Sequence, residues 1–241
     1  APADGYTLVF VSAPFAINIS VYNKLPYDTR KDFAAIGLNA TYSLVLVTNL
    51  KVPAKTVSEL IAYAKGKRGA ITWATTGPGT SPFLATELFR KQAGFDGVAA
   101  TYNSSPASLI DLIGGRVELT LVVIPSAIPH IPAKRIHAVG VTSPTRSTLL
   151  PDVPTIAESG MPGFQSVGYT GAVAPAKVPR AIIEKLNKAI VGVLSNPAMQ
   201  ERYARQGITA TPSTVAEFSK LFKNETEKWA KVVREAKIPQ Q

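Results

Sequence analysis

The sequence predicts an α/β fold in which short strands alternate with amphipathic helices. A strand at Ala70–Ala74 precedes a helix that begins near Ser81–Pro82, and a strand at Val98–Thr101 precedes a helix that begins near Ser105–Pro106. Because strand, loop and helix follow one another twice, the pattern is typical of a parallel sheet that is covered on both faces.

Length and composition define the class of protein. The chain has 241 residues, of which 46% are hydrophobic and 17% charged, so it can bury a full core in one large lobe or two medium ones. It contains no cysteine, which excludes disulfides and thiolate chemistry. No apolar run reaches the length of a membrane span. We expect no signal peptide within this chain, which starts at Ala1–Gly5.

The net charge of +10 suits nucleic acid, an anionic membrane surface or an acidic small molecule as partner. The basic residues are scattered, with small clusters only at Lys65–Arg68 and across Lys220–Lys237. We interpret them as solvated helix faces and expect no nucleic-acid partner.

Extended segments flank the alternating region. Tyr6–Ser12 is apolar enough for a central parallel strand, and Ala13–Pro14 leads into a helical turn. Asp32–Leu38 continues into Ser43–Val47 as a long, interrupted extended segment, and Val167–Pro175 is a second one. These two long segments could carry the chain between lobes.

Helix signals mark the remaining elements. Capping boxes at Thr56–Glu59 and Thr214–Glu217 each predict a helix start, and Asn196–Pro197 predicts another. Three helices are expected to close the sequence, the last with an aromatic stripe that belongs to the core. Ile124–Pro132 holds three prolines and allows at most a short helical turn.

The two Ser-Pro helix starts are candidate anion sites. We expect Ser81 and Ser105 to be N-caps, with Pro82 and Pro106 as the first helical residues. The free N–H groups of a first helical turn, together with about half a positive charge from the helix dipole, can hold an anion without a basic side chain. Capping alone is the alternative explanation of either loop.

Catalytic signatures are missing. The chain has no GxSxG, HExxH, GxxxxGK[ST] or CxxC pattern, and Pro82 stands where a GxGxxG loop that starts at Gly77 needs its last glycine. The two histidines, His130 and His137, have no acidic residue at i+4 spacing. We therefore expect no catalytic residues, no metal and no cofactor.

A series of motifs extends over essentially the whole chain: DGYTL at Asp4–Leu8, LPYD at Leu25–Asp28, SELIAYAK at Ser58–Lys65, TELF at Thr86–Phe89, DLIGGRVE at Asp111–Glu118, PSAIPHI at Pro125–Ile131, the run at Ala138–Phe164, and EKWAKVVREAKI at Glu227–Ile238. In this order and spacing, the sequence resembles the substrate-binding proteins of tripartite tricarboxylate transporters, also called Bug receptors.

The resemblance implies a two-lobed fold like that of type II periplasmic binding proteins, with parallel-sheet lobes joined by two crossings and a ligand cleft between them. Residues 1–42 and 168–241 would form lobe 1, and residues 43–167 lobe 2. It implies a monomeric periplasmic receptor, not an enzyme, that captures a small organic carboxylate and delivers it to the membrane subunits of a tripartite transporter. The alternative is an α/β enzyme acting on a phosphorylated or carboxylated metabolite.

The resemblance also implies where the ligand binds, because relatives hold a carboxylate with loop amides, hydroxyls and water. The implied contacts come from four segments: Ser12 and Ala13; Thr76, Gly77, Gly79, Thr80 and Ser81; Tyr102, Asn103, Ser104 and Ser105; and Tyr169 and Thr170.

The sequence departs from its relatives in three places. It lacks the strand, ligand loop and helix that precede the DGYTL position in relatives, so lobe 1 is expected to be incomplete at its N-terminal side. Tyr102–Ser104 replaces tyrosine, a basic residue and glycine, which makes this loop less cationic. Val123–Ile124 replaces a position often held by Asp or Asn, which favours an aromatic or aliphatic carboxylate over citrate.

Overall fold

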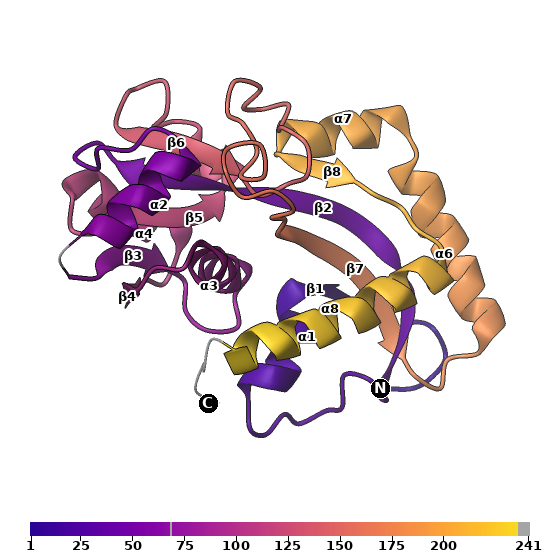
Figure 1. Ribbon diagram of the computed structural model, residues 1–241. Coiled ribbons are helices and arrows are strands. Elements are labelled where there is room, and N and C mark those ends of the chain that lie inside the picture. The colour runs from indigo at the N-terminus through magenta and orange to yellow at the C-terminus, as the bar shows by residue number, and fades with distance from the viewer. Residues whose placement is uncertain (68, 236–241) are drawn as a thin grey trace. The chain divides into compact units, whose positions relative to one another are not determined.

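A computed structural model describes residues 1–67 and 69–235 (Figure 1). The chain divides into two compact units: unit 1 is Ala1–Thr41 with Gly168–Gln241, and unit 2 is Tyr42–Val167. Strand β2 (Phe33–Asn49) begins in unit 1 and ends in unit 2, and β7 (Val167–Pro175) begins at the second boundary. The expected interruption of the first long segment is wrong, because β2 is one continuous strand of 17 residues.

Unit 1 contains an antiparallel pair of strands. β1 (Val9–Ser12) pairs with β7, which neighbours β2, and the short β8 (Ile208–Ala210) also pairs with β2. The prediction of a central parallel strand at Tyr6–Ser12 is therefore wrong: β1 is short and antiparallel, and it stands at one end of the strand order of the described residues. Phe10 is 71% exposed, so the apolar character of this segment did not reflect burial.

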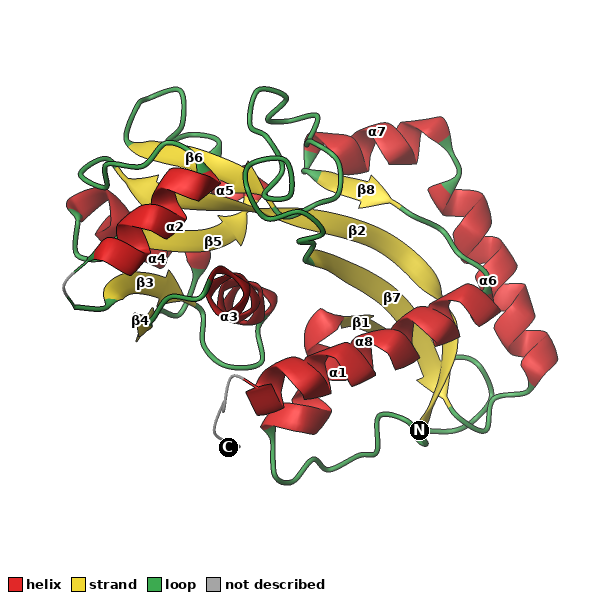
Figure 2. Ribbon diagram, in the orientation of Figure 1, coloured by secondary structure: helices red, strands yellow, loops and turns green. Residues whose placement is uncertain are grey.

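The three expected closing helices are present in unit 1: α6 (Arg180–Leu194), α7 (Pro197–Arg205) and α8 (Val215–Glu235). The same unit contains α1 (Ala13–Val21). Figure 2 shows α8 beside α1 and along the strands of this unit. The aromatic stripe of α8 is confirmed as core at Phe218 and Trp229, both buried. A Cβ on Gly171 of β7 would lie 2.1 Å from the Phe218 ring, so only glycine lets α8 pack this closely.

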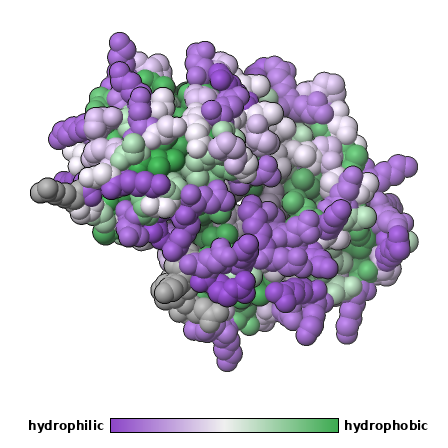
Figure 3. Space-filling model, in the orientation of Figure 1, coloured by the Kyte–Doolittle hydropathy of each residue, from purple (hydrophilic) through white to green (hydrophobic). Residues whose placement is uncertain are grey.

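The start of α8 confirms its predicted capping box. The Thr214 N–H donates to Glu217 Oε2 at 2.8 Å, and the Glu217 N–H donates to Thr214 Oγ1 at 3.2 Å. The basic residues Lys220, Lys223 and Lys231 of this helix are exposed, as expected for a solvated face. Hydrophilic residues also cover much of the surface seen in Figure 3.

Unit 2 has a mixed sheet. β3 (Ile71–Thr75) lies parallel to both β4 (Gly97–Thr101) and β5 (Leu119–Val123), whereas β2 pairs antiparallel with β5 and with β6 (Ile136–Val141). The α/β class is confirmed, but the parallel pairs among the described residues are limited to β3, β4 and β5, because β2 enters unit 2 directly as an extended strand and pairs antiparallel with its neighbours there.

The described part of unit 2 has the helices α2 (Val57–Gly66), α3 (Ser81–Ala93), α4 (Ser105–Gly114) and the single turn α5 (Ile124–Ala127). The Thr56–Glu59 capping box of α2 is confirmed. Gly94 and Gly115 adopt the left-handed conformation that ends α3 and α4. Trp73, Phe89, Leu109 and Leu112 are fully buried in this unit.

Glu118 connects α2 and the residue after it to β3 in unit 2. Its carboxylate accepts hydrogen bonds from Tyr63 of α2 at 2.7 Å, from the Thr72 N–H of β3 at 2.9 Å, and from Lys67. Burial acts to raise the pKa of Glu118, but the hydrogen bonds from Lys67, Thr72 and Tyr63 outweigh it and lower the pKa. The same contact raises the pKa of Tyr63 to about 12.

Parts of some predicted segments lie outside the described residues: Arg68 of the Lys65–Arg68 cluster, and residues 236–238 of the C-terminal motif, with 239–241 of the expected lobe 1. None of the helices in the described ranges combines the length and the apolar character that crossing a bilayer requires.

Candidate functional site: loops at two helix starts

The loops that follow β3 and β4 start side by side in unit 2. Thr75 and Thr101 are partners at the last paired position of these parallel strands. The Tyr102 N–H donates to the Thr75 carbonyl at 2.8 Å, which extends the pairing into the second loop. The starts of α3 and α4 therefore follow the carboxyl ends of neighbouring strands, the edge at which open α/β sheets bind ligands.

The loop between β3 and α3 is held by its own hydroxyl groups. Thr80 Oγ1 donates to the Gly77 carbonyl at 2.7 Å, and Thr76 Oγ1 donates to Thr80 Oγ1 at 3.0 Å. Gly77 and Gly79 have φ values of +95° and +82°, which favour glycine. A Cβ at Gly77 would also lie 3.3 Å from Thr101 Cγ2. These hydrogen bonds and the two left-handed glycines thus define the shape of the loop.

The N-caps of α3 and α4 are Thr80 and Ser104, so the assignment of Ser81 and Ser105 as caps is wrong by one residue. Thr80 Oγ1 and Ser104 Oγ each accept the N–H three residues further on, at 3.4 Å. The prolines then occupy the second helical position, where a missing N–H costs as little as at the first. Sequence alone does not separate two adjacent residues that can both cap a helix.

This arrangement leaves one unpaired N–H in the first turn of each helix. Proline supplies none, and the cap accepts the next one. Within the described residues, the N–H groups of Ser81 and Ser105 donate to no protein acceptor, nor do those of Thr76, Gly79 and Asn103 in the same loops. The expected full set of first-turn donors is thus reduced to one at each helix. The loops nevertheless gather several uncharged donors at two positive ends of helix dipoles.

Tyr42 is a residue of this region that the sequence did not reveal. Its hydroxyl oxygen lies 3.4 Å from Ser81 Oγ at the start of α3, and either oxygen can be the donor. Tyr42 is the first residue of unit 2 and lies on β2. A lone tyrosine in an extended segment carries no motif, and its proximity to Ser81 depends on a pairing between distant strands.

Tyr102 uses its polar atoms within unit 2. Its hydroxyl donates to Asp111 Oδ2 at 2.9 Å, and Arg116 donates to Asp111 Oδ1 at 2.7 Å. Burial and the bond to Asp111 raise the pKa of Tyr102, while the bonds from Tyr102 and Arg116 lower the pKa of Asp111. With its N–H also engaged, Tyr102 has only its ring left to offer a ligand.

The other predicted contacts form a separate group in unit 1. Ser12 and Thr170 are cross-strand partners in the β1–β7 pair, and Ala13 and Tyr169 adjoin them in sequence. Ser12 is the N-cap of α1, but its side chain makes no capping hydrogen bond. Tyr169 is buried and packs edge to face on Phe218, with the ring centroids 6.3 Å apart. Each unit thus brings its own predicted residues together.

Two further sequence expectations concern the surroundings of the site. Ile124, expected to make the far pocket apolar, is buried in the core of unit 2, so only Val123 of this pair is partly exposed. Among the described residues, no three His, Asp or Glu side chains are arranged to hold a metal ion.

Solved structures of solute-binding proteins share this fold. "R. palustris Rpa4515 with adipate" has a TM-score of 0.87 and 28% identity, with 100% of this chain and 81% of that chain covered. "Structure of periplasmic binding protein BugD" has a TM-score of 0.84 and 26% identity, with coverage of 100% and 81%. MatC (Rpa3494) from Rhodopseudomonas palustris with bound malate has a TM-score of 0.80 and 26% identity, with coverage of 97% and 81%.

The fold is that of a solute-binding protein of the periplasmic-binding-protein class. The family model described as "Tripartite tricarboxylate transporter family receptor" matches residues 1–238. The chain belongs to this family of receptors, which confirms the resemblance seen in the sequence.

Proposed function

We propose that this protein is a periplasmic receptor that binds a small organic dicarboxylate and delivers it to the membrane subunits of a tripartite transporter. The family supports the receptor role, and the adipate and malate in two structures of the same fold support the ligand class. The observation that carries the proposal for this chain is the pair of adjacent loops whose N–H donors at Ser81 and Ser105 have no acceptor among the described residues.

One carboxylate group of the ligand would bind to these loops. The loops offer it uncharged donors: the N–H groups of Ser81 and Ser105, the hydroxyls of Ser81 and Tyr42, and the Asn103 amide. Hydrogen bonds to an ionised carboxylate are about twice as strong as bonds between neutral groups. Ser81 is buried, and in surroundings of low dielectric a hydrogen bond to a charge is stronger than in water. Thr76, Gly77, Gly79, Thr80 and Ser104 would keep the donors in place.

Unit 1 has its own residues that we propose as ligand contacts. Ser12 has a hydroxyl that is free of a capping role, and Thr170 is its cross-strand partner. Ala13 and Tyr169 are buried and would contribute shape rather than hydrogen bonds. Tyr102 would act in the same way through its ring.

The wider proposal describes a monomer that carries out no chemical conversion and binds no nucleic acid. The family consists of receptors, and the hydroxyl groups of Thr76 and Thr80 bond within their own loop rather than to a base. The scattered basic residues would confer solubility and attract anions over long range.

A thermal-shift and calorimetry series on the full-length protein tests the function. Adipate, malate, succinate and citrate are compared with adipamide, a neutral analogue of adipate. A dicarboxylate at 100 times its Kd should stabilise the fold by about 2.7 kcal/mol, and adipamide should not. A flat response to every acid would contradict the proposal. Mass spectrometry of the incubated acid distinguishes the enzyme alternative, which predicts loss of the compound with time.

A further inference from the structure

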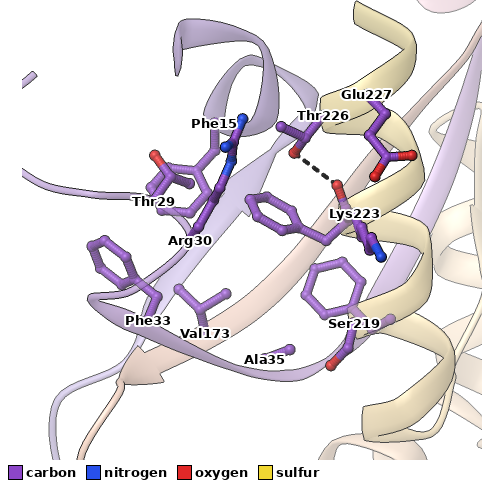
Figure 4. Close-up of a pocket in the computed structure, with 12 residues that line it drawn as sticks. Phe15, Thr29, Arg30, Phe33, Ala35, Val173, Ser219, Lys223, Thr226 and Glu227 are labelled. Atoms are coloured by element: carbon purple, nitrogen blue, oxygen red, sulfur yellow. Dashed lines mark hydrogen bonds between the residues drawn. The ribbon is translucent and has the colours of Figure 1, made fainter. Parts of the chain in front are cut away.

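Unit 1 has a pocket of about 470 Å³ that is lined by none of the residues of the proposed dicarboxylate site. Figure 4 shows Lys223 and Thr226 of α8 along one side, Phe15, Arg30 and Phe33 opposite, and Ala35 and Val173 on the strands between them. The volume falls in the range of about 300–1,000 Å³ that is usual for small-molecule sites.

The walls of the pocket are aromatic. The rings of Phe15 and Phe33 meet edge to face with centroids 5.0 Å apart, and Phe15 and Phe222 lie 5.8 Å apart. Tyr27 stacks behind Phe15 at 5.7 Å and fixes its orientation. Because these rings come from α1, β2 and α8, they surround the cavity on several sides, and a flat apolar group would bury much of its surface among them.

One hydroxyl in the pocket lacks a partner. Thr29 is 3% exposed, and within the described residues its Oγ1 makes no hydrogen bond. The other lining hydroxyls are satisfied: Thr226 donates to the Phe222 carbonyl at 2.8 Å, the dashed line in Figure 4, and Ser219 donates to the Val215 carbonyl at 2.8 Å. Leaving a buried hydroxyl unpaired is unfavourable, so a polar ligand atom that pairs with Thr29 would remove this cost.

The charged groups of the pocket favour an anion. Arg30 and Lys223 come from different elements, and Glu227 lies one turn beyond Lys223 on α8. No ion pair joins any of these three to another of the described residues. Two cations and one carboxylate leave one net positive charge beside an apolar cavity.

We propose that this pocket is a second ligand site that binds small aromatic monocarboxylates of the benzoate class. The ring lies among Phe15, Phe33 and Phe222, and the carboxylate interacts with Arg30 and Lys223 at the rim. The pocket shares no residue with the contacts proposed for the dicarboxylate.

Titration of the full-length protein with 4-fluorobenzoate, followed by ¹⁹F NMR, tests the proposal. Ser81→Leu is introduced to block the loop site, and this variant should still bind the probe saturably. Ala35→Phe fills the pocket and should abolish this binding, while leaving adipate or malate binding unchanged. The neutral analogue 4-fluorobenzamide should bind at least tenfold more weakly.

A milder pair of variants covers the case in which Ala35→Phe does not fold. Lys223→Gln should weaken 4-fluorobenzoate binding several-fold, whereas Lys220→Gln, also exposed on α8 but outside the pocket, should not. The proposal is overturned if the probe does not bind, if Ser81→Leu abolishes binding, or if Lys223→Gln and Lys220→Gln behave alike. Dicarboxylate binding is measured separately in each protein. A negative result for the aromatic probe is therefore distinguishable from a negative result for the receptor function.

Discussion

Tyr42 Oη and Ser81 Oγ lie 3.4 Å apart, which places the hydroxyl of a strand residue at the first turn of α3. The contact connects the first residue of unit 2 to the loop that we propose as a carboxylate site. A ligand that binds at Ser81 would therefore meet the tyrosine hydroxyl as well.

Tyr42→Phe tests this contact. Removing one hydrogen-bonding hydroxyl should weaken dicarboxylate binding by roughly 0.5–1.5 kcal/mol, or about two- to tenfold, as measured by calorimetry. Tyr63→Phe is the matched control, because it removes a hydroxyl that binds Glu118 elsewhere in unit 2. Equal affinities in Tyr42→Phe and wild type would remove Tyr42 from the site.

Ser105→Leu separates binding from capping. Since Ser104 is the cap of α4, replacing Ser105 leaves the capping bond intact but places a bulky side chain beside the free N–H. We expect at least a tenfold loss of affinity with little change in thermal stability. Ser104→Ala should instead lower the free energy of unfolding by about 1 kcal/mol and change the affinity little. A Ser105→Leu protein that binds normally would place the site elsewhere.

Gly77→Ala tests the geometry of the first loop. The substitution introduces a side chain at φ +95° and only 3.3 Å from Thr101, so both strain and crowding should shift the loop. We expect a stability loss of about 1–2 kcal/mol together with weaker ligand binding. Gly66→Ala, in a helix with no atom near the added Cβ, should leave both properties close to wild type. Normal affinity in Gly77→Ala would show that the loop need not be rigid.

Tyr102→Phe distinguishes a positioning role from direct contact. Its hydroxyl is committed to Asp111, so its removal should cost about 1 kcal/mol of stability but change dicarboxylate affinity less than twofold. Tyr102→Ala, which also removes the ring, should reduce affinity further. A large affinity loss in Tyr102→Phe would mean that the hydroxyl turns toward the ligand.

The pH dependence of stability should reflect Glu118. The pKa of this residue in the folded protein lies below its ordinary value of 4.5, so its stabilising contribution is complete above that pH and declines as the pH falls through the lowered pKa. Glu118→Gln should lose about 2 kcal/mol at neutral pH and show a flatter decline between about pH 5 and 3 in urea unfolding curves. Parallel curves for the two proteins would argue against this role.

Local sequence signals predicted most of the elements. Capping boxes at Thr56 and Thr214 and the glycines after α3 and α4 act within a few residues, and the structure has helix boundaries at these positions. Strand direction is a different matter. Nothing local in Tyr6–Ser12 specifies that its partner is β7, more than 150 residues later in the chain, so an apolar run was interpreted as a central strand.

The same limit applies to the candidate site. The two Ser-Pro loops were visible because each combines a strand end with a helix start, and the parallel pairing of β3 with β4 sets them side by side. Tyr42 and the pocket around Phe15 depend on contacts between distant segments, which no short motif reports. The position of the caps was missed for another reason: Thr80 and Ser81 can both cap a helix, and serine is the more common cap of the two.

The two-segment construction of unit 1 has a consequence for biosynthesis. All of Tyr42–Val167 leaves the ribosome before β7 and α8 do, so unit 2 has every strand and helix that it needs while unit 1 still lacks the partner of β1 and the helix that covers Phe15. Synthesis adds about 5–20 residues per second, so unit 1 of the nascent chain stays incomplete for several seconds. During that interval the early aromatic residues are a natural target for chaperones.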